Sequence, residues 1–593
     1  MINRFSHALP FGASLQPDGS TRFRLWAPDC ESVGLEVDGL PAIAMQPEAG
    51  GWFSIVAPCA ASAHYRYRVR PDLAVPDPAA RAQADDVHGA SVVVDPHGYV
   101  WQHADWCGRP WHETVLYETH VGLMGGFTGL AKRLPALAAL GVTAVELMPI
   151  ADFPGDRNWG YDGVLPFAPD AAYGTPDELK ALIDTAHGLG VMVFLDVVYN
   201  HFGPDGNYLN AYASRFFSAD KPTPWGAGID FRLPEVRWFF IENALYWLQE
   251  YRFDGLRLDA VHMIAEPDWL DELARSVRGA IEPHRHIHLV LEHDGNAAGH
   301  LTRGFDAQWN DDGHHALHVL LTQERGGYYA DYADAPAKHV ARCLAEGFSY
   351  QGEPSAYRGG EARGEPSAHL PPTSFVLFLQ NHDQIGNRAF GERLTTLCRP
   401  EALRAATALL LLSPQIPLVF MGEEWGCTKP FLYFTSYTDA LAEAVREGRR
   451  REFARFPAFE SPEERSRIPD PNAPSTYRAS DPQAPSAASS HDQGWLALYR
   501  GLLAIRHKAI VPHLPGAQAL EALAVDDAAV RASWRLGNAA ALTIAFNLAA
   551  GPANCGPLQG EVVFATDDDA RRLGPHGTLP PFSLIALLAA PSS

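Results

Sequence analysis

The chain has 593 residues, of which 47% are hydrophobic and 20% are charged, so it holds enough apolar material for a large core, and global disorder is excluded. Lysine and arginine number 47 against 70 acidic residues. The resulting net charge of −23 disfavours nucleic acid and anionic membranes as partners, because both are negatively charged themselves. A neutral ligand such as a sugar is compatible with this charge.

The 7 cysteines are widely spaced and form no CxxC pair, which argues against a disulfide framework or a zinc ribbon. The N-terminus has no apolar segment typical of a signal peptide. The most apolar stretch, residues 405–421, is interrupted by two prolines and is too short to span a membrane. We therefore expect a cytoplasmic protein that does not enter membranes.

Residues 1–100 have the pattern of an all-β domain. Short alternating runs at 21–28, 51–56 and 64–69 are separated by turns rich in Gly, Pro and Asp. This spacing predicts an N-terminal β-sandwich. A linker at 95–110 then leads into a domain of another kind.

Residues 111–510 alternate apolar, β-rich segments with helical ones. Continuous apolar strands are typical of a parallel sheet covered by helices, so the fold class is α/β and the predicted architecture is a (β/α)8 TIM barrel with inserted loops. Residues 176–190 are one intervening helix, with Pro176 in its first turn and Gly190 as its stop. The predicted strands are 115–121, 142–150, 191–200, 255–261, 288–293, 375–383 and 416–424, with a shorter one near 305–310.

The last part of the chain changes character twice. Residues 461–493 are rich in Pro, Ser and Ala, which predicts an exposed loop. Residues 495–510 form a final amphipathic helix of the barrel domain. Residues 515–593 return to short β-like runs, which predicts a C-terminal β-sandwich.

Four of the predicted barrel strands end in acids and histidines. They are DVVYNH (196–201), RLDAVH (257–262), LVLEHD (289–294) and QNHDQ (380–384). The carboxyl ends of parallel barrel strands face one common mouth, where barrel enzymes build their active sites. The sequence therefore predicts an active site from these four segments.

Two of these acids have the surroundings of a glycosidase pair. Arg257 and Asp259 lie two apart on one strand, so the guanidinium should keep Asp259 ionised, as a nucleophile requires. Glu292 follows an apolar run, which raises a carboxyl pKa and suits a general acid. The alternatives are a structural ion pair for Asp259 and a solvated strand-end acid for Glu292.

The other strand ends supply supporting groups. Asp383 could stabilise a positive transition state, or could simply cap a helix, and His382 could donate to a sugar hydroxyl. Asp196 could orient Arg257. His201 could bind sugar hydroxyls, or be a satisfied packing residue.

Two further clusters have competing interpretations. His314 and His318 are four apart, a spacing that can bind zinc on a helix, but no glutamate follows the first histidine, so we predict no metal site. Tyr161, within WGYDG at 159–163, could stack on a pyranose ring or be a buried ring in a turn. No Walker A, GxGxxG or GxSxG pattern occurs in a suitable context, and we expect no cofactor.

The four strand-end segments together resemble the four short conserved regions of the α-amylase family of retaining glycoside hydrolases. The resemblance implies that Asp259 is the nucleophile, Glu292 the acid/base and Asp383 the transition-state stabiliser. It also implies substrate contacts around the reacting sugar from Arg257, His201, His382 and Tyr161.

Within that family, the chain resembles the maltooligosyltrehalose trehalohydrolases at residues 148–164, 306–322, 380–394 and 430–453. The resemblance implies hydrolysis of the α-1,4 bond next to the terminal trehalose unit of maltooligosyltrehalose. Further residues implied to line the cleft are His262, Asn310, Asp311, Asp312, His314, His315, Gln384 and Asn387.

Two other functions stay open on the sequence. A glycogen branching enzyme would share the N-terminal sandwich and the three acids. A glucan- or protein-binding scaffold would be expected to have lost at least one of these acids, and all three are present. The sequence does not give the oligomeric state.

Overall fold

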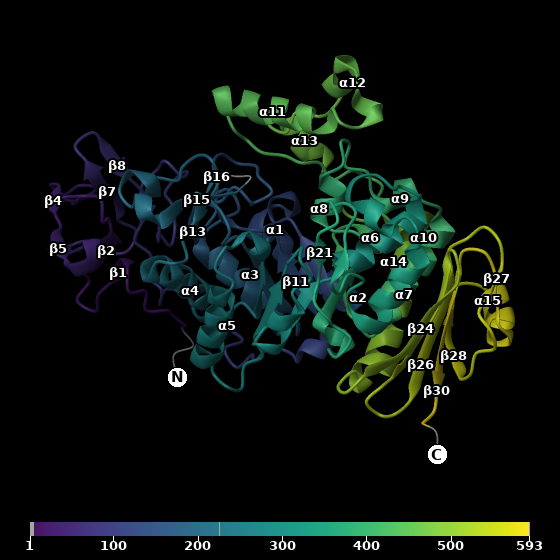
Figure 1. Ribbon diagram of the computed structural model, residues 1–593. Coiled ribbons are helices and arrows are strands. Elements are labelled where there is room, and N and C mark those ends of the chain that lie inside the picture. Colours follow the sequence, from purple (N-terminus) through teal and green to yellow (C-terminus); the bar gives the residue numbers. More distant parts are fainter. Residues whose placement is uncertain (1–4, 224–225, 592–593) are drawn as a thin grey trace.

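The computed structural model describes residues 5–223 and 226–591. Two N-terminal sheets, a central barrel and a C-terminal sheet follow one another across the molecule, in the order of the chain (Figure 1). The barrel thus lies between the two β-structures and contacts both.

The N-terminal region consists of two antiparallel sheets, as predicted. In the strand His64–Arg70, Tyr65, Tyr67 and Val69 are buried while the arginines between them are not, because successive strand side chains point to opposite faces. One sheet contains β1 (Gly12–Leu15), β2 (Thr21–Trp26), β6 (Trp52–Ala57) and β5 (Gln46–Glu48). The other contains β4 (Ile43–Ala44), β3 (Gly34–Val37), β7 (His64–Arg70), β8 (Leu73–Val75) and, paired to β7, β9 (Ser91–Val92).

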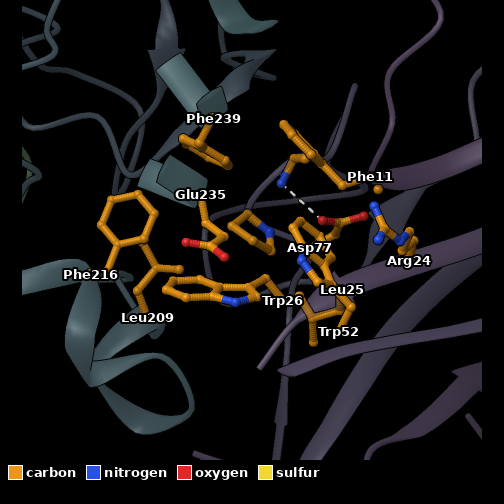
Figure 2. Close-up of a pocket in the computed structure, with 13 residues that line it drawn as sticks. Phe11, Arg24, Leu25, Trp26, Trp52, Asp77, Leu209, Phe216, Glu235 and Phe239 are labelled. Atoms are coloured by element: carbon orange, nitrogen blue, oxygen red, sulfur yellow. Dashed lines mark hydrogen bonds between the residues drawn. The ribbon is translucent and has the colours of Figure 1, made fainter. Parts of the chain in front are cut away.

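Aromatic side chains join the first sheet to the barrel. Phe11 stacks on Trp52 at 6.1 Å between ring centroids and on Phe239 at 5.5 Å. Phe239 belongs to the barrel helix α4 (Pro234–Gln249). Figure 2 shows a small pocket with Phe239 and Phe11 above it, Trp26 and Trp52 below it, and Glu235 between Phe239 and Trp26.

The central domain is a closed barrel of eight parallel strands, which confirms the predicted fold, including the short strand near 305–310. Its strands in spatial order are β10 (Leu116–Thr119), β11 (Ala144–Leu147), β14 (Met192–Val197), β17 (Gly255–Leu258), β18 (His288–Leu291), β19 (Ala307–Trp309), β22 (Phe375–Phe378) and β23 (Ile416–Phe420). Every residue of these strands is buried, as expected for strands with a packed interior on one face and helices on the other.

Helices with clear end signals surround the barrel. Helix α3 (Pro176–Gly188) begins with a capping box in which the side chains of Thr175 and Glu178 each accept a hydrogen bond from the other's backbone N–H. It ends just before Gly190, whose φ of 73° breaks the helix. The other helices around the barrel are α1 (Gly126–Ala131), α2 (Leu134–Leu140), α5 (Asp268–Ala280), α6 (Asp311–Thr322), α7 (Pro336–Glu346), α8 (His382–Gly386), α9 (Leu394–Leu397), α10 (Pro400–Leu412) and α14 (Ser490–Ile505). Within the described ranges, no helix combines the length and the apolarity needed to cross a membrane.

A helical arm projects from the barrel after its last strand. It comprises α11 (Asp439–Phe453), α12 (Pro462–Ser466) and α13 (Pro474–Ala479), and Figure 1 shows it above the barrel. The prediction of a plain loop over 461–493 was therefore wrong in part. Ser461 and Glu464 form a capping box that starts α12, a local signal that the Pro- and Ser-rich composition concealed.

The C-terminal region pairs a five-stranded antiparallel sheet with a two-stranded one. The larger sheet contains β24 (Gln518–Asp526), β25 (Ala529–Arg535), β26 (Ala541–Asn547), β30 (Ser583–Ala589) and β28 (Glu561–Ala565), and the smaller contains β27 (Ala553–Asn554) and β29 (Thr578–Leu579). Helix α15 (Asp568–Leu573) lies between β28 and β29 in the chain. Residues such as Leu558, Leu579 and Ile585 form an apolar cluster between the layers. The indole N–H of Trp534 donates to the carbonyl of Leu344 on α7 at 3.1 Å, which anchors the larger sheet to the barrel.

We expect Phe11→Ala to lower the free energy of unfolding by about 3–5 kcal/mol, because it removes a buried ring from the aromatic contact between sandwich and barrel. Val56→Ala, at a residue that is 58% exposed in the same sheet, should change it by less than about 0.5 kcal/mol. Urea unfolding of both variants measures the difference. Equal effects of the two substitutions would contradict the proposed contribution of Phe11.

Candidate active site

The site is organised around the buried guanidinium of Arg257 on β17. Nη1 donates to both carboxylate oxygens of Asp196, at 2.8 and 2.7 Å, and to Oδ1 of Asp259 at 2.7 Å. Nη2 donates to Oε2 of Glu292 at 2.7 Å. The guanidinium also lies over the ring of Trp309, 4.2 Å from its centroid. One cation thus holds acids from three neighbouring strand ends.

Asp259 has the electrostatic surroundings of an ionised carboxylate. Burial alone would raise its pKa, but the charges of Arg257 and His201 and the hydrogen bonds that it accepts hold the pKa below the ordinary value. One of these bonds comes from Asn200, whose Nδ2 donates to Oδ2 at 2.8 Å. The group is therefore negative at neutral pH.

Glu292 is tuned in the opposite direction. Burial raises its pKa well above the ordinary value, and this outweighs Arg257, while the nearby charges of Asp259 and Asp383 add to the rise. Oε2 accepts both from Arg257 and from the backbone N–H of Ala260, at 2.8 Å. With both of these donors on Oε2, a proton on this carboxyl belongs on Oε1, and the raised pKa favours the protonated form.

The backbone directly after Asp259 is strained. Ala260 has a φ of 39°, in the left-handed region that a residue with a Cβ rarely adopts. This conformation directs its N–H to Glu292. The strain thus occurs where it links the two carboxyls, which is a common location for strain in active sites.

Asp383 lies in the first turn of helix α8. Asp383 does not cap this helix. The N-cap is Asn381, and Gln384 completes the capping box. The side chain of Asp383 is 45% exposed, and its Oδ1 accepts from Nδ2 of Asn387 at 3.0 Å. It is therefore a solvent-facing carboxylate, beside Nε2 of His382 at 3.9 Å.

The rings of Tyr161 and His382 form the floor of the site. They stack with centroids 5.0 Å apart and an angle of 23°. The hydroxyl of Tyr161 donates to Oδ2 of Asp196 at 2.6 Å. His201 is buried, with its ring nitrogen in contact with the side-chain oxygen of Asn200. The geometry brings all of these sequence-predicted residues together around Arg257.

Five of the cleft residues implied by the family resemblance have side chains that are at least partly exposed to solvent. Asp311 is partly exposed, and burial together with the charges of Asp294, Asp383 and Asp312 raises its pKa to about 7 against the opposing effect of Arg363. The other four are His262, His315, Gln384 and Asn387.

The remaining three differ from the expectation. Asn310, Asp312 and His314 are fully buried, so in this structure they support the cleft wall from behind and do not line it. Asn310 caps α6, and Asp312 accepts from Arg363 at 2.7 Å. His314 contacts the carbonyl of Leu379 at 2.6 Å. Their polar atoms form hydrogen bonds within the protein.

Two residues that contact the site were not among those expected from the sequence. Glu118 on β10 binds His382, and Trp309 on β19 lies beneath Arg257. For Glu118 a signal was available, since an acid inside the apolar run 115–121 must be either paired or uncharged when it is buried. The stacking of Trp309 depends on strand order and had no local signal.

A cavity of about 820 Å³ adjoins the site on the side of Asp383. It is bounded by the loop after α6, by the segment after α8 and by the helical arm. Aromatic side chains line it, among them Tyr328, Tyr357, Phe456 and Phe459, and Gln384 and Asn387 lie at its edge. Within the described residues, no group of three or more His, Cys, Asp or Glu side chains is arranged to hold a metal ion.

Comparison with known proteins gives the same family along the whole chain. A model described as the catalytic domain of α-amylase matches residues 95–225, and one described as a domain of unknown function matches residues 517–585. A malto-oligosyltrehalose trehalohydrolase from Deinococcus radiodurans is 41% identical over 85% of this chain and 84% of its own length. One from Rhizobium sp. strain M-11 is 35% identical over 98% of this chain and 99% of its own length.

A solved structure agrees with these relatives. A crystal structure described as a "putative alpha amylase", from Salmonella typhimurium, is 44% identical, with a TM-score of 0.92 over 98% of this chain and 100% of that one. By contrast, a 1,4-α-glucan branching enzyme from Corynebacterium jeikeium is 34% identical over only 43% of this chain and 40% of its own length. The similarity to the trehalohydrolases is therefore the more extensive one.

We expect Arg257→Met to lower the free energy of unfolding by about 3–5 kcal/mol, because three buried or partly buried carboxyls lose their common cation. Arg237→Met is the matched control, since Arg237 binds the more exposed Asp268 and Glu272, and it should cost about 1 kcal/mol or less. Urea unfolding measures both. A cost for Arg257→Met no larger than that of the control would contradict the role of Arg257 as the organising charge.

Proposed function

This chain belongs to the malto-oligosyltrehalose trehalohydrolases of the α-amylase family, and we propose that it releases trehalose from maltooligosyltrehalose by retaining hydrolysis of the adjoining α-1,4 bond. The observation that carries the proposal is the shared guanidinium of Arg257, which binds Asp259 through one nitrogen and Glu292 through the other, while the pKa of Asp259 is lowered and that of Glu292 is raised. A retaining glycosidase requires two carboxyls beside the glycosidic bond that it cleaves, one protonated to act as the acid and one ionised to act as the nucleophile.

In the first step, Glu292 gives its proton to the glycosidic oxygen and Asp259 attacks the anomeric carbon. The C–O bond to the trehalose unit breaks, and an ester between Asp259 and the sugar forms with inverted configuration. Positive charge develops on the sugar ring meanwhile, and the exposed carboxylate of Asp383 is placed to stabilise it.

In the second step, Glu292 acts as a base. It takes a proton from a water molecule, which attacks the anomeric carbon and releases Asp259 as a carboxylate. The second inversion restores the α configuration, and Glu292 is again protonated. We expect the carboxyls of Asp259 and Glu292 to lie ~5–5.5 Å apart, as this mechanism requires.

We infer that the trehalose end of the substrate occupies the cavity beside Asp383. A site that must recognise a chain end has to be bounded, whereas an internal segment of a glucan needs a groove open at both ends. The helical arm supplies a boundary through Phe456 and Phe459. The exposed rings of Tyr328 and Tyr357 offer faces on which pyranose rings can stack.

The branching enzyme remains the alternative activity, because it would use the same three acids. Its relative matches less than half of this chain, which makes it the weaker candidate. We also infer a cytoplasmic location, which the 7 free cysteines support, and an activity that needs no cofactor.

Incubation with maltotriosyltrehalose should yield trehalose and maltotriose, with maltotriose appearing first as its α-anomer in the NMR spectrum. Asp259→Asn should lower kcat by about four orders of magnitude, because it removes the nucleophile. Asp184→Asn, a buried acid on the outer helix α3, should leave turnover unchanged. New α-1,6 branches on amylose without trehalose would refute the assignment, and an initial β-anomer would refute the role of Asp259.

The pH profile of kcat/KM should be bell-shaped with a broad plateau. Activity falls on the acid side when Asp259 takes up a proton, at a pKa below its ordinary 3.8. It falls on the alkaline side when Glu292 loses its proton, at a pKa well above its ordinary 4.5. On a maltosyl fluoride, whose leaving group needs no proton, Glu292→Gln should remove the contribution of Glu292 to the alkaline limb, so that the limb reports only His382, whose pKa is raised to about 9. An alkaline limb identical to that of the wild type would contradict the assignment of Glu292.

A further inference from the structure

Glu118 and His382 form a buried pair that joins the first barrel strand to the segment carrying Asp383. The two side chains are 1% and 3% exposed. Oε1 of Glu118 accepts the Nδ1–H of the His382 ring, and Oε2 accepts the backbone N–H of the same residue at 3.2 Å. Both oxygens of one carboxylate therefore hold one histidine, through its ring and through its main chain.

Three aromatic rings fix the plane of this imidazole. Tyr161 stacks on its face, Trp159 meets it edge-on at 5.6 Å and 88°, and Trp309 lies 6.2 Å away. With Nδ1 bound to Glu118, the ring presents Nε2 to the side of Asp383. The 3.9 Å from Nε2 to Oδ1 of Asp383 is too long for a direct hydrogen bond, so the Nε2–H is available to a third group beside that carboxylate.

The carboxylate also sets the charge of the ring. Burial lowers the pKa of His382, but the charge and the hydrogen bond of Glu118 outweigh this and raise the pKa to about 9. The other titratable or charged groups that act on it are Asp383, Arg257, Glu146, His120 and Tyr161. A cationic imidazole bound to a carboxylate is neutral as a pair, so it can donate without opposing the positive charge of a sugar ring in the transition state.

We propose that Glu118 is a positioning residue, which fixes the tautomer and orientation of His382 so that its Nε2–H is presented to a hydroxyl of the sugar that Asp383 stabilises. The proposal rests on the function proposed above. Glu118 itself does not reach the sugar, since both of its oxygens are bound to His382. It acts through the ring, because a carboxylate that accepts from one imidazole nitrogen sets the protonation and the direction of the other nitrogen.

Glu118→Gln tests this, because it keeps the size of the side chain and removes its charge. The pKa of His382 should then fall toward the ordinary 6.5. We expect kcat on maltotriosyltrehalose to drop about a hundredfold at mildly alkaline pH, with KM little changed, because the lost donor acts mainly in the transition state. Activity should recover as the pH is lowered toward about 5, where the imidazole is protonated again.

Two further variants separate positioning from structure. Glu118→Asp keeps the charge and withdraws the carboxylate, so kcat should fall while the pH profile stays that of the wild type. Glu146 is the neighbour of Glu118 in the strand register, buried and without a hydrogen bond to either oxygen, and burial raises its pKa well above the ordinary value. Since this acid is already uncharged, Glu146→Gln should leave the pH profile unchanged.

The proposal is overturned if Glu118→Gln has a kcat within about twofold of the wild type, or loses activity equally at every pH. Should this variant fail to fold, NMR of the wild-type protein decides the matter: the ring carbons of His382, assigned by their loss in His382→Gln, should titrate near pH 9. Titration near 6.5 would overturn the proposal. Trehalose release by the wild type is measured in the same assay, so a failure of the proposed function is seen separately.

Discussion

The chemistry of this protein depends on one buried cation that is shared among several acids. Arg257 contacts Asp196, Asp259 and Glu292 at hydrogen-bond distance and lies on the face of Trp309. Carboxyls this close together in a dry interior would not all remain charged, and without a cation they would repel one another. Because guanidinium nitrogens are fixed in one plane, Arg257 also fixes the relative positions of the acids that it binds.

The same cation acts on Asp259 and Glu292 with different results, because their surroundings differ. Asp259 receives additional support from Asn200 and His201, and its pKa ends below the ordinary value. Burial raises the pKa of Glu292, and the nearby charges of Asp259 and Asp383 add to the rise, so its pKa ends above the ordinary value. The division between nucleophile and acid is therefore produced by neighbours, since the two side chains differ by only one methylene group.

Much of this site could be predicted from the sequence, because the barrel converts local patterns into a shared location. Asp259, Glu292 and Asp383 each follow an apolar strand, and parallel strands place their carboxyl ends at one mouth. What could not be predicted depended on contacts between distant segments. The family resemblance placed Asn310 and Asp312 in the cleft, but the side chain of Asn310 caps α6 and that of Asp312 binds Arg363. Helix α12 was missed because its signal is the Ser461–Glu464 capping box, which lies inside a Pro- and Ser-rich stretch without periodicity.

Glu118 and Glu146 are two buried acids of the barrel interior, and they are accommodated in different ways. They are register partners on adjacent strands, so two negative charges there would repel strongly. Glu118 has a cationic partner in His382, whereas both oxygens of Glu146 are without one, and burial keeps Glu146 protonated. The charge therefore resides on the acid that binds His382. This places a fixed carboxylate behind the imidazole on the side of Asp383, and it makes the first barrel strand a part of the site even though that strand contributes no group that reaches the sugar.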